Sequence, residues 1–327
     1  MWPVLPQRSD TVPPSDDRRR GAADGTGRAL TVVVNPSSGS STDIAATVRG
    51  RLPAARIVEL EGKDQLLRRL DEAASDCDVL GIAGGDGSVA TAVGIALAHS
   101  RPLLVLPAGT LNHLARDLRI ESAEDAIDAF AAGETVGVDV AAVDGQLFVN
   151  TAGLGAYPQM LAYRERFESR LGRWPGQLVA FIKTVIESTP LDVTLDGQRR
   201  PVWMIFISNW LYEPSGLGPS WRPRLDDRRL DVRVLRADVP HSRFRLAAAM
   251  LSGHLPRSAA YSETTVPELR IGSPHRRLSI ARDGERVDAP GHLLVNKPAR
   301  RLEVFARHRP HGNTAVARGA PSRWSVR

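Results

Sequence analysis

The most constraining feature of this sequence is a pattern that occurs twice between Val79 and Leu118: an apolar run ends in a glycine-rich turn, and a helical stretch follows. Residues 79–83 and 101–106 are short apolar runs of the length of buried strands, and they end at GGDGS (84–88) and PAGT (107–110). Strands that feed helices in this way predict a parallel sheet with covering helices, an α/β fold.

Two parallel strands that end in glycine-rich turns bring two sets of backbone N–H groups to one edge of the sheet. Helix N-termini at that edge favour phosphate. Asp86 lies in the middle of the first turn, where a carboxylate would repel a phosphate unless a cation or a proton-transfer step stood between them. The turn therefore indicates phosphoryl transfer with a divalent metal rather than passive anion binding.

An earlier strand, Leu30–Val34, ends in a turn of similar character, NPSSG (35–39), and a helix is expected from about Asp43 to Arg51. This turn lacks the G-x-G-x-x-G spacing that a dinucleotide-dependent dehydrogenase would need. Alone it is simply a good turn, but one strand–helix unit before GGDGS it is predicted to form a second wall of the same site.

GGDGS followed by PAGTLNHLARDL resembles the catalytic domain of the diacylglycerol kinase and sphingosine kinase family, whose usual forms are GGDGT and P-x-G-T-x-N-x-x-A. The resemblance covers roughly Leu30 to Ala306. It implies an N-terminal Rossmann-like three-layer domain with the NAD kinase/diacylglycerol kinase-like fold, followed by a C-terminal β-sandwich domain. It also implies an ATP-dependent lipid kinase that transfers the γ-phosphoryl group to the hydroxyl of diacylglycerol or of a sphingoid-type base, and nothing in the sequence selects between these acceptors.

The resemblance assigns nucleotide contacts to all three turns and a catalytic role to Asp86, which would organise metal and phosphate. The residues implied to bind nucleotide are Asn35, Pro36, Ser37, Ser38, Gly39, Gly84, Gly85, Asp86, Gly87, Ser88, Gly109, Thr110 and Asn112.

The segment RLDDRRLD (224–231) resembles the family's D-D-G-x-L-D segment, in which a carboxylate and neighbouring backbone oxygens hold Mg²⁺. Asp227 is the matching carboxylate, and Arg224 and Arg229 would supply main-chain oxygens only. Arg228 departs from the family's glycine, which changes the dihedral angles open to the turn and lowers cation affinity electrostatically. A charged surface hairpin remains the alternative to a metal site here.

The D-G-E tripeptide at 283–285 has the composition of a hairpin turn and proves nothing alone. By resemblance, Glu285 is the catalytic general base that takes the proton of the acceptor hydroxyl as the hydroxyl attacks the γ-phosphate. Such a carboxylate belongs on the acceptor side of the reaction, and the resemblance implies that a cleft between the two domains admits the lipid hydroxyl.

Three departures from the family pattern leave open altered metal use, altered donor preference or reduced activity. Ser88 keeps the hydroxyl of the usual threonine, but Ala90–Thr91 replaces a common Asn-Glu pair and Arg228 replaces glycine. The alternatives are a kinase of a soluble acceptor on the NAD kinase-like fold and a catalytically impaired nucleotide- or lipid-binding protein. Intact Asp86 and Glu285 argue against the second, because a binding protein needs neither carboxylate.

The length of 327 residues indicates two domains. The βα pattern stops near Gly133, so we expect a disordered leader (1–28), a nucleotide-binding catalytic domain (29–135) and a β-rich acceptor domain (136–295). A closing strand (296–307) would return to the first domain, and a disordered basic tail (308–327) would follow. Prolines and acids occupy the N-terminus where a signal peptide needs an apolar core.

The net charge of +6 favours anionic partners, and no aromatic–basic interleaving or zinc spacing points to nucleic acid. Apolar runs are too short to span a bilayer, so the expected contact is peripheral, with an anionic membrane. The single cysteine, Cys77, excludes an internal disulfide and fits a reducing compartment, in line with a cytoplasmic, peripherally membrane-associated protein. A homodimer is left open.

Overall fold

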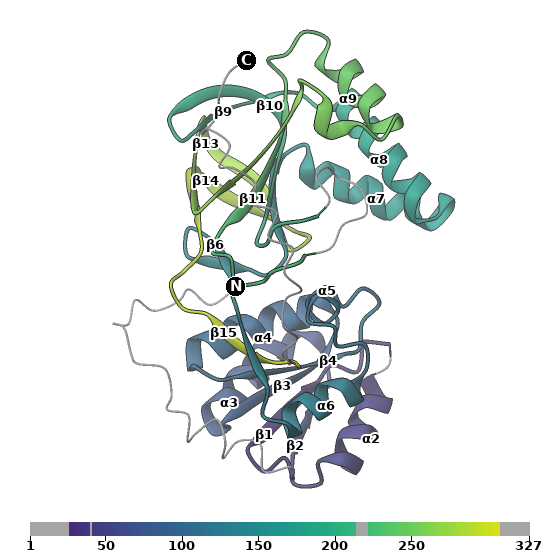
Figure 1. The fold of residues 1–327 in the computed structure, drawn as a ribbon, viewed down its shortest axis with the longest axis vertical. Helices are drawn as coiled ribbons and strands as arrows, with labels where there is room; N and C mark the ends of the chain where they lie inside the picture. The colour runs from purple at the N-terminus through teal and green to yellow at the C-terminus, as the bar shows by residue number, and fades with distance from the viewer. Residues whose placement is uncertain (1–25, 40, 214–221, 308–327) are drawn as a thin grey trace. The chain divides into compact units, whose positions relative to one another are not determined.

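The computed structural model describes residues 26–39, 41–213 and 222–307, so most of the predicted leader and all of the predicted tail lie outside the described residues. The chain divides into two compact units, and Figure 1 shows the fold of each. Unit 1 comprises Met1–Val140, Gly145–Val149 and Pro298–Ala315, and unit 2 comprises Ala141–Asp144, Asn150–Lys297 and Val316–Arg327.

Unit 1 is built on a six-stranded sheet with the order β2-β1-β3-β4-β15-β5. Its central strands, β1 (Leu30–Val34) and β3 (Val79–Gly84), are buried along their whole length and pair in parallel. The parallel neighbours β2 (Arg56–Glu59) and β4 (Leu103–Pro107) flank this pair. Apolar runs buried on both faces are what a parallel sheet covered by helices requires.

The helices of unit 1 cover this sheet (Figure 1), and the predicted α/β class of the N-terminal domain is confirmed. They are α2 (Ser41–Arg51), the short η1 (Lys63–Gln65), α3 (Leu66–Asp76), α4 (Asp86–His99), α5 (His113–Asp117) and α6 (Ala123–Ala131). Helix α4 consists almost entirely of small and aliphatic residues and is buried over most of its length. A helix that is apolar all round belongs in a core, so the turn before it is held on a fixed support.

The predicted domain boundary between residues 135 and 136 is wrong, because it falls inside β5 (Thr135–Val138). This strand pairs with β15 (Leu302–Phe305) in the first sheet, and β15 also runs parallel to β4. The alternating pattern after Gly133 was assigned to the second domain because alternation cannot tell which sheet a short strand joins.

The second sheet is antiparallel and has nine strands in the order β12-β11-β10-β8-β13-β14-β6-β7, with β9 beside β10 and β13. Registers place β8 and β9 end to end between those two strands. This long-stranded antiparallel sheet confirms the predicted β-sandwich class of the C-terminal domain. The strands are β6 (Ala141–Val143), β7 (Gln146–Phe148), β8 (Thr151–Gly155), β9 (Leu191–Leu195), β10 (Gln198–Ser208), β11 (Leu230–Arg236), β12 (Tyr261–Val266), β13 (Glu268–Arg282) and β14 (Glu285–Asn296).

Helices α7 (Tyr157–Leu171), α8 (Arg173–Glu187) and α9 (Ser242–Leu251) gather on one side of the strands of unit 2, and η2 (Leu255–Arg257) follows α9 (Figure 1). Phe181 and Val185 of α8 are buried in the core between helices and sheet. These two side chains of α8 therefore pack inward. None of the described helices is long and apolar enough to cross a membrane.

Candidate functional site

The GGDGS and PAGT turns approach each other backbone to backbone in unit 1. A Cβ on Gly109 would lie 2.6 Å from the Cα of Gly85, and one on Gly84 would lie 2.6 Å from the Cβ of Ser88. Real Cβ atoms do not come this close to another carbon, so both positions require glycine. The glycines of these turns therefore allow the two turns to contact each other.

Helix α4 starts at this junction, with Gly85 as its N-cap and Asp86 as its first residue. The first helical hydrogen bond runs from the Val89 N–H to the Gly85 carbonyl, at 3.0 Å. The N–H groups between these two residues have no acceptor within the helix, as at any helix start. The sequence predicts that these N–H groups, together with the helix dipole, bind an anion, and this stays a prediction.

Asp86 joins the starts of two helices. Its Oδ1 accepts a hydrogen bond of 2.7 Å from the backbone N–H of His113, the first residue of α5. The carboxylate thus fixes the position of the PAGT turn relative to α4, and two helix N-termini stabilise its negative charge. Its predicted catalytic role stays a prediction, and the structure adds a positioning role.

The two asparagines predicted to contact nucleotide use their side-chain amides within the chain. Asn112 closes its own turn, since its Oδ1 accepts from the Gly109 N–H (2.9 Å) and its Nδ2 donates to the Gly109 carbonyl (2.7 Å). The buried Asn35 donates from Nδ2 to the Ser88 Oγ (2.9 Å) and accepts at Oδ1 from the Ser37 N–H (3.1 Å). These contacts assign both amides to shaping the turns.

A hydrogen bond from the Gly85 N–H to the Ser38 Oγ (3.2 Å) links the NPSSG turn to GGDGS. All three predicted turns therefore belong to one connected assembly, which we call the three-turn cluster (residues 35–39, 84–88 and 107–112). Its exposed members are Pro36, Ser37, Gly39, Gly87 and Thr110. Direct nucleotide contact by these residues remains a prediction.

In unit 2, Asp227 is held by a buried lysine. Its Oδ1 lies 2.9 Å from the Nζ of Lys297 and accepts from the Arg229 N–H at 2.9 Å. The side chains of Lys297 and Asp227 are 2% and 8% exposed. The other oxygen, Oδ2, is buried without a hydrogen-bond partner.

This arrangement does not fit the Mg²⁺ site that the resemblance implies. At an effective dielectric constant of about 20, a dication about 3 Å from the carboxylate gains about 11 kcal/mol, and an ammonium about 5 Å away takes back about 7 kcal/mol of it. Mg²⁺ also sheds its water reluctantly and needs a strong ligand set in return. Within the described residues, no three His, Cys, Asp or Glu side chains gather as a metal cluster.

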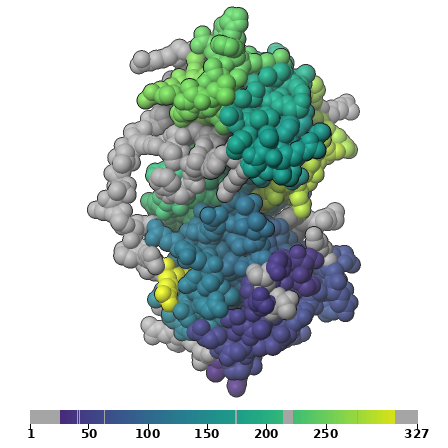
Figure 2. Space-filling model, turned by 90° about the vertical axis from the view of Figure 1, so that its right-hand side faces the viewer, coloured from purple at the N-terminus to yellow at the C-terminus, as the bar shows by residue number. Residues whose placement is uncertain are grey.

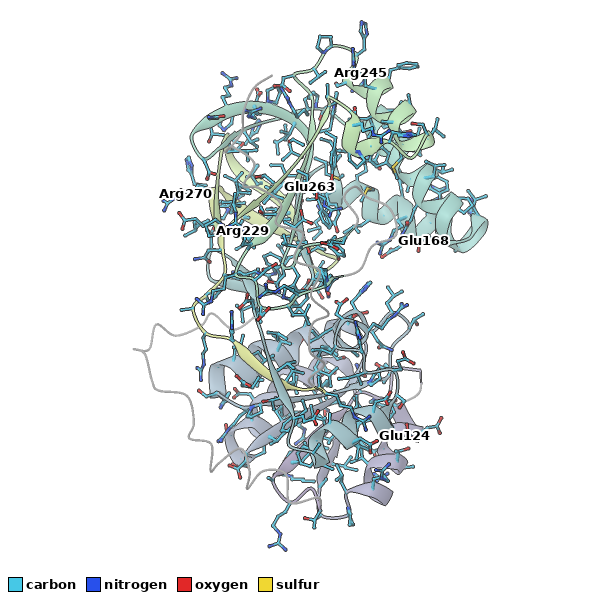
Figure 3. The ribbon with its side chains drawn as sticks, in the orientation of Figure 1. Glu124, Glu168, Arg229, Arg245, Glu263 and Arg270 are labelled. Carbon is cyan, nitrogen blue, oxygen red and sulfur yellow. The ribbon has the colours of Figure 1, made fainter. Side chains whose placement is uncertain are left out.

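Arg228 keeps the backbone conformation that its turn requires. Its φ is +55°, in the left-handed region that glycine adopts without cost. Arg229 follows and donates from its guanidinium to the backbone oxygen of Thr265 (2.6 Å); Figure 3 labels it in unit 2. The departure from glycine thus leaves the turn intact and adds strain and positive charge to it.

Glu285 is exposed at the first position of β14 and pairs with Arg282 across a two-residue turn. The turn residues Asp283 and Gly284 both have positive φ, +46° and +90°, as a type I′ hairpin requires. The Oδ1 of Asp283 accepts from the backbone N–H groups of Asn150 (2.7 Å) and Thr151 (3.1 Å). This carboxylate pins the hairpin and so holds Glu285 in place.

Sequence reasoning missed three residues that organise unit 2: Asp283, Lys297 and Arg222. The guanidinium of Arg222 lies 5.0 Å from the ring of Trp210 and 4.8 Å from the ring of Tyr212, and it donates to the Asn150 Oδ1 at 3.1 Å. Lys297 could have been noticed as one of only three lysines in an arginine-rich chain. No local pattern marks Arg222.

Residues 29–143, which carry the three-turn cluster, match the family model of the diacylglycerol kinase catalytic domain. The resemblance stated from GGDGS and PAGT is thereby confirmed. The match to the family model ends at β6, so Glu285 and Asp227 lie outside it.

Curated relatives carry the same family name. The chain is 29% identical to the diacylglycerol kinase of Bacillus subtilis (strain 168) over 196 residues, and 32% identical to that of Staphylococcus carnosus (strain TM300) over 131 residues. These matches cover 56% and 38% of this chain. They span 63% and 42% of the relatives' own length.

Solved structures share the fold. The crystal structure of a diacylglycerol kinase from Bacillus anthracis str. Sterne superposes with a TM-score of 0.60 at 18% identity, covering 86% of this chain and 97% of its own. A second B. anthracis structure reaches a TM-score of 0.65 at 20% identity, over 86% and 98%. Both the catalytic domain and the β-rich part that follows it therefore have the fold of these proteins.

Proposed function

We propose that the chain is an ATP-dependent lipid kinase that transfers the γ-phosphoryl group to the hydroxyl of diacylglycerol or of a sphingoid-type base. The observation that carries the proposal is the contact between Gly85 and Gly109, which brings the starts of α4 and α5 together with Asp86 between them. Two helix starts and a glycine-lined edge bind polyphosphate, and the family match adds the kinase class.

In the proposed reaction, the oxygen of the acceptor hydroxyl attacks the γ-phosphorus, and the bond from that phosphorus to the bridging oxygen of ADP breaks. The hydroxyl proton passes to the carboxylate of Glu285, and ADP leaves with the bridging oxygen. Support for Glu285 comes from its exposure at the tip of a pinned hairpin, where a general base can meet a substrate. Mg²⁺ enters this scheme with ATP, as part of the substrate.

The test is phosphate transfer from labelled ATP to lipids in mixed micelles with magnesium, comparing wild type with Glu285→Gln and Asp86→Ala. A phosphorylated lipid that both substitutions abolish would support the reaction and name its acceptor. Transfer to no lipid, with tight ATP binding that Asp86→Ala alters, would favour a soluble acceptor or a binding protein instead. Lipid product that persists unchanged in Glu285→Gln would keep the kinase and remove this base.

A lipid acceptor requires contact with a membrane, and we propose that the face formed by α8 and α9 of unit 2 makes it at the cytoplasmic side. On α9, Phe244 and Leu251 are 76% and 64% exposed, and Ala248 between them completes a stripe at helical spacing. Ile186 of the neighbouring α8 is 55% exposed. In Figure 2, α7 and α8 (teal) and α9 (green) make up one stretch of the surface.

The charges around this stripe favour an anionic lipid surface over another protein. Arg243 and Arg245 flank Phe244, both are exposed, and Figure 3 labels Arg245 at the α9 end of unit 2. Exposed aromatic and aliphatic side chains next to guanidinium groups suit insertion at the boundary between headgroups and acyl chains.

The measurement for this contact is co-flotation with vesicles that contain or lack phosphatidylglycerol, using the double substitution Phe244→Ser/Leu251→Ser. Because each side chain gains about 1.5–3 kcal/mol on full burial, we expect binding to fall at least about 10-fold. Leu67→Ser, which alters an exposed leucine of unit 1, is the control and should bind like wild type. Equal flotation of the double variant would exclude this face, and concentration-dependent dimers that it abolishes would assign the face to a second copy.

A further inference from the structure

We propose that Lys297 takes the place of a divalent cation at Asp227, so that this chain needs no metal to order the loop before β11. The ammonium group follows the end of β14 and neutralises the one carboxylate that the resemblance assigns to Mg²⁺. The proposal concerns the architecture of unit 2, and it stands or falls independently of the proposed reaction.

Geometry supports the replacement. The two residues are 70 positions apart in the chain, yet their charged atoms lie 2.9 Å apart. The same Asp227 oxygen accepts a hydrogen bond from the Arg229 N–H at 2.9 Å. This oxygen therefore links the loop before β11 to the lysine that follows β14. A cation bound at Asp227 would neutralise the same carboxylate oxygen that the ammonium of Lys297 contacts here.

Charge and burial support it as well. With side chains 2% and 8% exposed, neither partner can rely on water for neutralisation, so each depends on the other. The loop also carries the positively charged Arg224, Arg228 and Arg229. A dication bound here would be repelled by these charges, and Lys297 already neutralises the Asp227 carboxylate that would attract it.

The unpartnered Oδ2 of Asp227 makes the proposal testable in a second way. If the ammonium were removed, this buried carboxylate would lose the charged group that contacts it, and its Oδ2 would still have no hydrogen-bond partner. Its site would then attract a hard cation such as Mg²⁺ or Ca²⁺. We therefore expect that substitution of Lys297 creates a metal dependence that the wild type lacks.

The experiment follows thermal unfolding without nucleotide, in EDTA and in millimolar MgCl₂ or CaCl₂. Tryptophan fluorescence follows unit 2 through Trp203 and Trp210, which are both buried in it. The wild-type Tm should be the same in EDTA and in metal. Lys297→Met should lower the Tm in EDTA by about 6–15 °C, because it leaves a buried charge unpaired, and metal should recover much of the loss.

Two further variants serve as controls. Lys183→Met removes a lysine that pairs with Glu187 on the surface of α8, and it should change the Tm little with or without metal. Asp227→Asn/Lys297→Met removes both charges, so it should be more stable than Lys297→Met in EDTA and show no metal effect.

The wild-type Tm in EDTA and in metal is compared without Lys297→Met, so a failure of that variant to fold cannot protect the proposal. A wild-type Tm that rises by several degrees with Mg²⁺, and does not in Asp227→Asn, would show that the metal site is present and would overturn the inference. A Lys297→Met protein that is destabilised but not rescued by metal would also overturn it, because the lysine would then not stand in for a cation.

Discussion

The three-turn cluster of unit 1 and the Asp227 loop of unit 2 hold their shapes by opposite means. In the cluster, neutral amides, hydroxyls and backbone groups satisfy one another, and Asp86 is the one charge among the contacts described above. In the Asp227 loop, the buried ion pair between Lys297 and Asp227 holds the shape. Hydrogen bonds between neutral groups leave Asp86 as the single charge in these contacts, whereas an ion pair closes its own site to a second cation.

The largest expected effect comes from changing the charge of Asp86 while keeping its positioning role. Asp86→Asn preserves an Oδ1 that can accept from His113, whereas Asp86→Ala removes the acceptor. If the charge acts in phosphoryl transfer, Asp86→Asn should lower kcat about 10²–10³-fold, as for loss of a preorganised electrostatic group, with Tm unchanged.

Initial rates with labelled ATP and circular dichroism melting would check this. Asp86→Ala is the comparison, since it should also lower the Tm. If Asp86→Asn kept activity within a few-fold of wild type, Asp86 would have a positioning role alone. The negative charge in the cluster would then not be needed for the reaction.

The second prediction concerns alkaline pH in unit 2. Burial raises the pKa of Tyr157 to about 12, although the hydrogen bond with Thr151 opposes this. Because the folded pKa exceeds the unfolded value near 10, the stabilisation is complete below pH 10 and is lost as pH rises toward 12. A shift of about two pKa units corresponds to about 2–3 kcal/mol.

Tryptophan fluorescence between pH 8 and 12 should therefore show unit 2 unfolding at a higher pH in Tyr157→Phe than in wild type. Cys77 serves as the matching probe of unfolding in unit 1. Burial raises the pKa of its thiol to about 11 and keeps the thiol from reacting with thiol reagents while unit 1 is folded. An unchanged midpoint in Tyr157→Phe would show that other groups control alkaline unfolding.

The sequence predicted the three-turn cluster because its determinants are local. Buried strands of five or six residues, glycine turns and helix starts follow one another directly, and parallel pairing brings the strand ends to one edge. The roles of Asn35 and Asn112 were not predictable at this level. An amide beside a turn can contact a ligand or close the turn, and only the distances to Ser88 and Gly109 show that it closes the turn.

The Asp227 loop was less predictable because its partner is remote. A motif marks Asp227, but nothing within the motif points to a lysine 70 residues away. The same holds for β5, whose place in the first sheet is fixed by pairing with β15 near the end of the described chain. Contacts over such sequence distances follow from the whole fold rather than from local pattern.

The third prediction tests the backbone contact in the cluster. Gly109→Ala places a methyl group 2.6 Å from the Cα of Gly85, so the turns must separate. Overpacking of this kind costs about 1–3 kcal/mol, and ATP affinity should fall with it. Gly87→Ala is the control for stability, because it meets nothing within 4 Å and lies inside α4, where alanine gains about 0.5–1 kcal/mol.

Chemical denaturation would measure both changes, with isothermal titration for ATP. Equal stability of the two variants would mean that the turns do not approach each other as closely as described, and that the anion site is not built on this contact.

The smallest expected effect sharpens the account of the Asp227 loop. Arg228 holds a left-handed φ of +55° that glycine adopts freely and alanine does not. Arg228→Gly and Arg228→Ala both remove the guanidinium, so the difference between them isolates the backbone. Arg228→Gly should be more stable than Arg228→Ala by about 1 kcal/mol, measured by urea denaturation with tryptophan fluorescence. Neither variant should gain a metal dependence while Lys297 remains, because the ammonium on Asp227 excludes the cation whether or not the loop is strained. A Mg²⁺-dependent stabilisation of Arg228→Gly alone would instead assign the exclusion to Arg228, and the glycine in the family's loop would then be its metal-binding determinant.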